Sequence, residues 1–190
     1  MPDWSGLRQF AWGQAGLFRL EDAVVFGFYA QSLAKHVVNG KLTRLQHGIY
    51  RLSCCPPMEN EQLVEAWLWS RRVGVISHET ALQLHNLSDA LPGKIHLTLP
   101  KSGSRRLVTP PLYRVWFNDI PPKDRVWIGS VPTTNPARTV NDIAASFGSG
   151  DIVKQAIEEG VHRRLFSVFD VIPAIIYVGS IIVPAPLGEG

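Results

Sequence analysis

The stretch that decides the fold runs from Tyr29 to Leu52 and reads YAQSLAKHVVNGKLTRLQHGIYRL. Its first part, residues 30–39, predicts a helix that is closed by a glycine and has an inward face of Leu33, Val37 and Ala34. Its second part has two short alternating segments, residues 42–45 and 49–52, on either side of a turn that contains glycine. Such a pair predicts a β-hairpin directly after the helix.

The residues before this stretch predict two further helices. Apolar residues recur at helical spacing in residues 3–13, and residues 21–26 begin with two acids, which the helix dipole favours. Residues 16–19 form a brief extended link between them. The resulting order of helix, strand, helix, helix and hairpin is that of a winged helix-turn-helix.

The residues after the hairpin predict a second part of mixed α+β structure. The run Cys54-Cys55-Pro56-Pro57 breaks the chain. Helices are expected at residues 59–72, 78–86, 136–147 and 151–164, and strands at 73–76, 94–99, 112–117 and 126–131. We therefore expect an α+β protein with a winged helix-turn-helix domain over residues 1–55, an α+β domain over 56–170 and an apolar tail over 171–190.

The tail has no charged residue from Val171 to Gly188, but Pro173, Gly179, Pro184 and Pro186 interrupt it. A membrane span needs about 20 apolar residues in continuous helix, so a packed strand and loop or a loosely ordered tail is expected instead. The two cysteines are adjacent and form no disulfide framework, and the first residues do not resemble a secretory signal. These features predict a cytoplasmic protein without a membrane partner.

The positive charge is concentrated at the start of the chain. The 190 residues carry 19 basic and 16 acidic side chains, a formal net charge of +3. Residues 1–52 contain six of the basic and three of the acidic ones, and no acid lies between Lys35 and Leu52. Charge of one sign in a short folded segment indicates either a polyanionic partner or a solvated basic face.

The predicted third helix and hairpin supply the candidate DNA contacts. In a helix-turn-helix the outward residues of this helix reach base edges in the major groove, and the wing approaches the backbone or minor groove. The candidates are Tyr29, Gln31, Ser32, Lys35, Asn39, Lys41, Arg44, His47 and Arg51. The alternative is a winged helix that binds only protein, with these residues as ordinary solvated side chains.

Signals for catalysis, cofactors or metal are weak. His78, His85 and His96 could ligate zinc, but without a metal-binding spacing they are expected to be packed or capping residues. Asp142 and Asp151 lack the paired acids and lysine of a nuclease, and no phosphate-cradling glycine loop occurs. We therefore expect no enzyme, no catalytic residues, no cofactor and no bound metal.

Three segments together resemble the AbiEi-type antitoxins of type IV toxin–antitoxin systems. They are GKLTRLQHGIYRL at 40–52, SHETALQLHNL at 77–87 and VPTTNPARTVNDIA at 131–144. The resemblance covers roughly residues 15–165. It implies an N-terminal winged helix that binds the protein's own promoter and represses the operon. It also implies a second domain that opposes a nucleotidyltransferase-type toxin, commonly without a stable complex.

The chain departs from this family at several positions. Tyr29 stands where a capping serine is common, and Ala30, Ala34 and Val38 stand where relatives often have arginine. Fewer arginines imply weaker phosphate contacts. The residues after Leu165 do not match the usual polar helical ending. An alternative function is therefore an interaction module that neutralises a toxin by direct contact, with the apolar tail as part of its surface.

Overall fold

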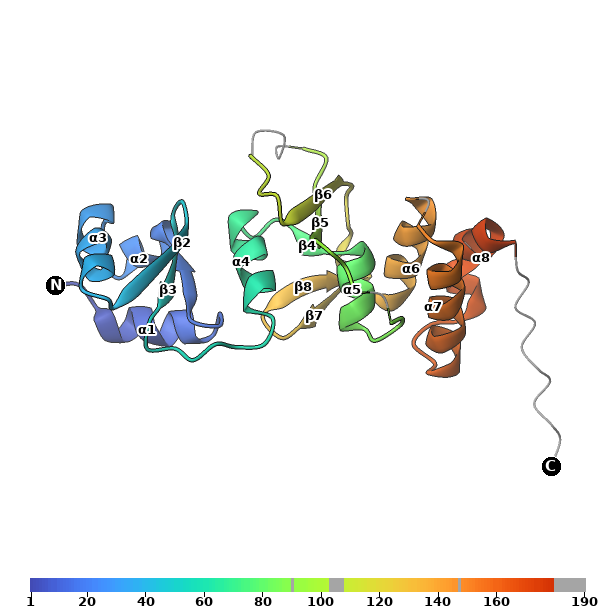
Figure 1. Ribbon diagram of the computed structural model, residues 1–190, viewed down its shortest axis with the longest axis horizontal. Coiled ribbons are helices and arrows are strands. Elements are labelled where there is room, and N and C mark those ends of the chain that lie inside the picture. Colours follow the sequence, from blue (N-terminus) through green and yellow to red (C-terminus); the bar gives the residue numbers. More distant parts are fainter. Residues whose placement is uncertain (90, 103–107, 147, 180–190) are drawn as a thin grey trace, which may run out of the picture.

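The structure, a computed structural model, describes residues 1–89, 91–102, 108–146 and 148–179. Its elements follow one another along an elongated molecule: helices around a small sheet, a second sheet, and a group of helices (Figure 1). The fold is α+β, with an N-terminal winged helix-turn-helix followed by a mixed α+β part, so the predicted fold class is confirmed.

The winged helix has the predicted order of elements. It contains α1 (Trp4–Trp12), β1 (Leu17–Arg19), α2 (Leu20–Val25), α3 (Ala30–Val38), β2 (Leu42–Gln46) and β3 (Ile49–Leu52). The three strands form an antiparallel sheet in the order β1-β3-β2. Gly48, with φ +73°, forms the turn between β2 and β3, where a residue with a Cβ would be strained.

Both faces of this small sheet are covered. Phe18, Tyr50 and Leu52 point into the core that the sheet shares with α1, α2 and α3. Leu17 and Ile49 alternate with them and point to the opposite face, into a core that includes residues of α4 (Glu61–Trp69). The winged helix is therefore joined to the second part of the chain by a continuous hydrophobic core.

Polar bonds reinforce this junction. The Arg19 guanidinium donates to the Leu68 carbonyl oxygen at 3.1 Å and pairs with Glu21. Arg72 pairs with Asp22 at 2.6 Å, and the Ser130 hydroxyl donates to the Gly13 carbonyl oxygen at 3.1 Å. Several side chains of the winged helix thus serve the junction and not its outer surface.

The second sheet has five strands in the order β6-β5-β4-β8-β7. They are β4 (Val75–Ile76), β5 (Ile95–Leu99), β6 (Tyr113–Phe117), β7 (Arg125–Ile128) and β8 (Val131–Thr134). Pairing is parallel for β5 with β6 and for β4 with β8, and antiparallel for the other neighbours. The single strand expected at 126–131 is instead the hairpin of β7 and β8, which turns at Gly129 with φ +57°.

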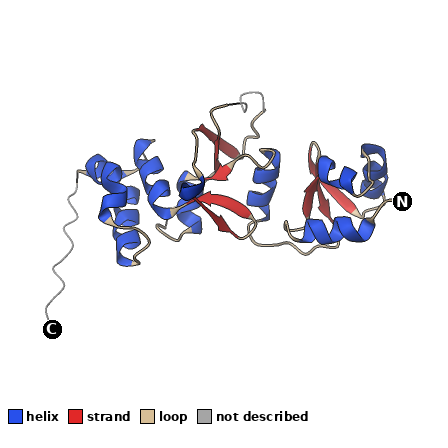
Figure 2. Cartoon of the chain, turned by 180° about the vertical axis from the view of Figure 1, so that it is seen from behind, coloured by secondary structure: helices blue, strands red, loops and turns tan. Residues whose placement is uncertain are grey.

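Helix α5 (His78–Leu84) lies beside the second sheet, and α6 (Pro136–Ala145), α7 (Gly150–His162) and α8 (Ile172–Val178) form the far end of the molecule, which Figure 2 shows from behind. Two 3-10 turns occur, at Pro122–Asp124 and Val168–Val171. Together these α-helices form a core of their own that includes Leu82, Val140 and Ile157. Among the described residues, none of the helices has the length and hydropathy that crossing a membrane requires.

The first residues of the apolar tail form a helix and not a strand or loop. Pro173 fits the first turn of α8, where its missing N–H costs nothing, and Gly179, with φ +65°, ends the helix. Val171 and Ala174 are fully buried against the other C-terminal helices, which explains why this apolar segment is ordered. The remaining tail residues, 180–190, lie outside the described residues.

Candidate nucleic-acid interface

Helix α3 is held at its first turn and along one side. The Ser32 hydroxyl accepts a hydrogen bond from the Tyr29 backbone N–H at 2.9 Å and donates to the Tyr29 carbonyl oxygen at 2.8 Å. Leu33 is fully buried in the core of the winged helix, and Val37 packs against that core. Tyr29 itself is 65% exposed at the start of the helix. Ser32, a candidate DNA contact, thus has a local structural role.

The exposed side of α3 presents two parallel rows of side chains. One row is polar and consists of Gln31, Lys35 and Asn39; the other is apolar and consists of Ala30, Ala34 and Val38. Each row has a spacing of four residues, which places its members on one side of a helix. Ala34 is exposed, so its assignment to the inward face was wrong: Leu33 and Val37 alone fill the space against the sheet.

The wing carries the second group of candidates. Arg44 pairs with Tyr50 across the hairpin, and a bulge follows between Arg44 and Gln46. The Arg44 Nη2 lies 3.0 Å from Nδ1 of His47 at the tip, and both side chains are exposed. Lys41, directly before β2, is also exposed. The strand therefore places one arginine on the same face of the sheet as α3, because Tyr50 points into the core beneath that helix.

Arg51 does not join this surface. Its Nε lies 2.6 Å from Oε1 of Glu61, and its Nη2 donates to the Cys55 carbonyl oxygen at 2.9 Å. Arg51 follows Tyr50 in the strand, and successive side chains of a strand point to opposite faces of the sheet. Arg51 therefore lies on the face that is turned toward α4. The positive charge of Arg51 therefore serves the junction with the second part of the chain.

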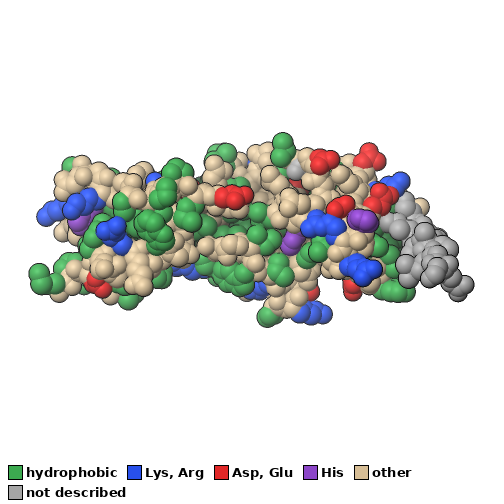
Figure 3. Space-filling view, turned by 90° about the horizontal axis from the view of Figure 1, so that it is seen from below, with side chains coloured by type: hydrophobic (Ala, Val, Ile, Leu, Met, Phe, Trp, Pro, Cys, Tyr) green, Lys and Arg blue, Asp and Glu red, His purple; other side chains and the backbone are tan. Residues whose placement is uncertain are grey.

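The segment that forms α3 and the wing contains no carboxylate of its own. No acidic residue occurs between Asp22 and Glu59 in the sequence. The acids that precede this interval have local partners: Asp3 caps α1 by accepting from the Gly6 N–H at 2.8 Å, while Glu21 and Asp22 pair with Arg19 and Arg72. Figure 3 shows Lys and Arg side chains over the winged-helix end, whereas most Asp and Glu side chains in that view lie over the rest of the molecule.

The wing is also fixed next to its tip by the second part of the chain. The Gln46 side-chain amide donates to Oε1 of Glu65 in α4 and, at 2.8 Å, to the hydroxyl of Tyr113 in β6. The oxygen of the Tyr113 hydroxyl accepts this bond, and burial raises the pKa of Tyr113 well above its usual value. The sequence held no signal for this contact, since the partners are far apart along the chain.

The three histidines that could have suggested zinc have roles in packing and hydrogen bonding. The rings of His78 and Trp116 stack at 4.1 Å, and Nδ1 of His78 lies 3.0 Å from the Ser77 hydroxyl, which accepts from Thr98. Nε2 of His85 lies 2.7 Å from the Thr134 carbonyl oxygen. Among the described residues, no cluster of three or more His, Cys, Asp or Glu could hold a metal ion.

These histidines predict acid sensitivity of the fold. Burial, helped by the nearby positive charges, lowers the pKa of His78 to about 3 from its ordinary 6.5, and burial also lowers the pKa values of His85 and His96. Between pH 6.5 and pH 3 the unfolded chain binds more protons than the folded chain. The contribution of His78 to stability is therefore complete above pH 6.5 and is lost as the pH falls toward 3. Each histidine contributes a slope of up to about 1.4 kcal/mol per pH unit.

Urea unfolding between about pH 7 and pH 5, above the ordinary pKa values of Asp and Glu, measures this slope. We expect the free energy of unfolding to fall over this range. His78→Phe should fall less steeply because the titrating imidazole is gone, while its aromatic ring still packs against Trp116. His162→Gln, a change at an exposed histidine, should leave the wild-type slope intact. Stability that is constant between these pH values would contradict the prediction.

Three helices followed by a hairpin, with β1 added to the hairpin sheet and the third helix exposed beside it, place this part of the chain in the class of winged helix-turn-helix proteins. Within that class, residues 7–53 match the family described as "Transcriptional regulator, AbiEi antitoxin". The match begins within α1 and ends just after β3, so it covers most of the winged helix, and it confirms the resemblance there. No curated protein matches the chain.

Proposed function

We propose that this protein is a sequence-specific DNA-binding antitoxin that represses its own toxin–antitoxin operon and opposes a nucleotidyltransferase-type toxin. The observation that carries the proposal is that α3 and the wing have no acidic residue of their own, while Lys35, Lys41 and Arg44 are exposed and without ion-pair partners among the described residues. Duplex DNA, a regular polyanion, is the partner that such a surface fits. The cytoplasm is the compartment where it would act.

We assign two kinds of contact to this surface. Lys35, Lys41 and Arg44 neutralise phosphates, with Tyr29 and His47 at the edges of the contact. Gln31 and Asn39 offer amides to base edges, and Gln pairs bidentately with adenine. Ser32 supports these contacts by holding the first turn of α3, and Arg51 is left out because it is paired with Glu61.

The apolar row of α3 adds a preference for thymine. Val38 is 86% exposed although it is apolar, and Ala34 lies one turn before it on the same side. In the major groove only thymine presents a methyl group, and small apolar side chains contact it. Gln31 together with this row favours half-sites rich in A·T pairs.

Fluorescence anisotropy with the protein's own promoter fragment tests the proposal. Binding should be tighter than to unrelated DNA of equal length, and its salt dependence should have a slope of about −0.9 for each neutralised phosphate. Replacing thymine by deoxyuridine in the bound half-site should weaken binding about fourfold per lost methyl contact. Equal affinity for both DNAs contradicts specific binding, whereas specific binding that deoxyuridine leaves unchanged contradicts only the reading of thymine.

We propose that residues 1–55 carry the DNA contacts and that the second part of the chain, residues 56–170, carries the antitoxin role. This second part acts without catalysis. Co-expression with the product of the neighbouring toxin gene tests this role. We expect the intact chain to restore growth. A chain that represses the promoter but leaves the toxin active would contradict the antitoxin role alone.

A further inference from the structure

An open groove runs between α4 and α5, on the side of the second sheet that also borders the wing. Its volume is about 1030 Å³, and its lining comes from the loop before α4, both helices, the start of β5 and the start of β6. This volume lies at the upper end of small-molecule sites, which span about 300–1,000 Å³. The groove is open to solvent and its lining is spread over several segments of the chain, which suits an elongated occupant better than a compact one.

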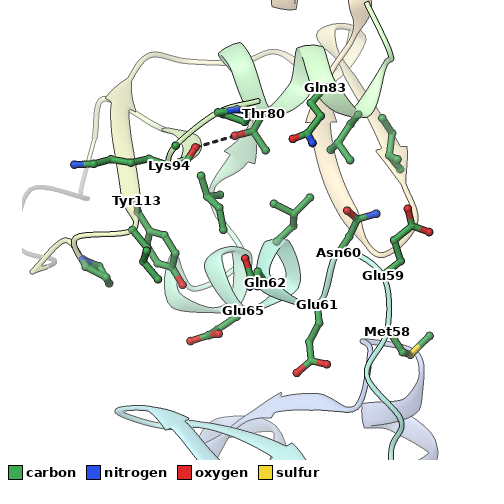
Figure 4. Close-up of a pocket in the computed structure, with 18 of the residues that line it drawn as sticks. Met58, Glu59, Asn60, Glu61, Gln62, Glu65, Thr80, Gln83, Lys94 and Tyr113 are labelled. Atoms are coloured by element: carbon green, nitrogen blue, oxygen red, sulfur yellow. Dashed lines mark hydrogen bonds between the residues drawn. The ribbon is translucent and has the colours of Figure 1, made fainter. Parts of the chain in front are cut away.

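The polar lining is unusually rich in free amides. Asn60, Gln62, Gln83 and Asn86 are exposed, and within the described part of the chain none of these side chains forms a hydrogen bond. Figure 4 shows Gln83 of α5 and Asn60 of the loop before α4 extending into the space between the two helices. Each amide offers both donors and an acceptor, which matches the alternating N–H and C=O groups of an extended polypeptide.

The apolar lining lies between these amides. Leu63 is 7% exposed, and Leu84 and Ile95 are half-buried beside it, while Leu112 is 68% exposed at the edge. Pro57, Pro92 and Pro110 also line the groove and carry no backbone N–H. A bound segment could not add as a strand along these prolines, so side-chain amides must supply its hydrogen bonds while alternate side chains enter the apolar floor.

Opposite charges stand at the two ends. Lys94 lies beside Tyr113 at one end, and Glu59 lies near Met58 at the other (Figure 4). Both are exposed, and neither has an ion-pair partner among the described residues. Nucleic acid is disfavoured here because Glu59, Glu61 and Glu65 all line the groove. An occupant with an acid at one end and a base at the other would be complementary.

We propose that this groove binds an extended segment of a partner protein, acidic where it meets Lys94 and basic where it meets Glu59. Gln46, which anchors the wing next to its tip to Glu65 and Tyr113, also lines the groove. The groove therefore extends to the wing. The proposal does not depend on DNA binding, because it rests on other residues.

A library of random peptides displayed on phage, panned against the full-length protein, tests the proposal. We expect enrichment of peptides with an acidic and a basic residue several positions apart and apolar residues between them. The double variant Asn60→Ala/Gln83→Ala should bind the enriched peptide about tenfold more weakly, since two amide contacts are lost. Gln9→Ala, which removes an exposed amide on α1, is the matched control and should bind as the wild type does.

Reversal of the end charges tests the orientation. Lys94→Glu/Glu59→Lys should bind poorly to the enriched peptide and regain affinity for the same peptide with its end charges exchanged. The proposal is overturned if no peptide is enriched, or if enriched peptides bind the amide and charge variants as they bind the wild type. It is also overturned if sedimentation shows a dimer that Gln83→Ala dissociates, since the occupant would then be a second copy of this chain.

Discussion

Replacing Lys35 and Arg44 together by alanine is expected to weaken promoter binding about 100-fold, or about tenfold for each side chain. Both cations are exposed and neither forms an ion pair among the described residues, so each is available to a phosphate. The slope of log affinity against log salt should become shallower by about one unit per replaced cation, because fewer counterions are released. Anisotropy titrations at several salt concentrations measure both quantities.

Two control substitutions separate local contacts from net charge. Lys154→Ala removes a positive charge from an exposed position of α7, and Glu158→Ala removes a negative charge from the same helix. Neither should change promoter affinity or the salt slope beyond small long-range effects. If Lys154→Ala weakened binding as much as Lys35→Ala does, the contact would depend on overall charge and not on α3.

The winged helix could be predicted from sequence because its signals are local. Leu33 and Val37 repeat at helical spacing, Gly40 follows directly, and His47-Gly48 separates two alternating runs, so each element is specified by residues within a few positions of one another. Most of the candidate contacts consequently lie on one side of α3 and on the wing, with exposed side chains.

The errors arose where distant residues decide the outcome. In the sequence Arg51 looks like one more basic residue of the wing, and its ion pair with Glu61 becomes visible only in the fold. β8 is short and contains a proline and two threonines, and its place inside the second sheet depends on the pairing of Thr133 with Ile76, 57 positions away in the chain. α8 is ordered because Val171 and Ala174 pack against the other C-terminal helices, whose residues come earlier in the chain.

The position of α4 has the largest consequence for the division of the chain. Leu17 and Ile49 are 0% and 2% exposed, and the residues that cover them include Leu63, Val64 and Leu68 of that helix. The polar bonds from Arg51 to Glu61 and from Arg19 to the Leu68 carbonyl oxygen cross the same boundary. All of these partners lie beyond residue 55, where the sequence placed the end of the DNA-binding domain.

A fragment of residues 1–55 is therefore expected to lack a cooperative thermal transition and to bind the promoter weakly, although it holds every proposed DNA contact. Exposing a fully buried apolar side chain costs about 1.5–3 kcal/mol. The exposure of both Leu17 and Ile49 would therefore remove most of the free energy of unfolding of so small a domain. Circular dichroism melting and anisotropy measure the two outcomes.

Leu17→Ala in the full chain provides the matched point change, with an expected loss of about 3 kcal/mol. Val25→Ala, at a residue that is 81% exposed, should cost less than about 0.5 kcal/mol. If the fragment melted sharply and bound the promoter as tightly as the full chain, α4 would be dispensable and the winged helix would fold alone. The expected result instead assigns α4 two roles, since the helix that closes the back of the DNA-binding sheet also forms one wall of the groove.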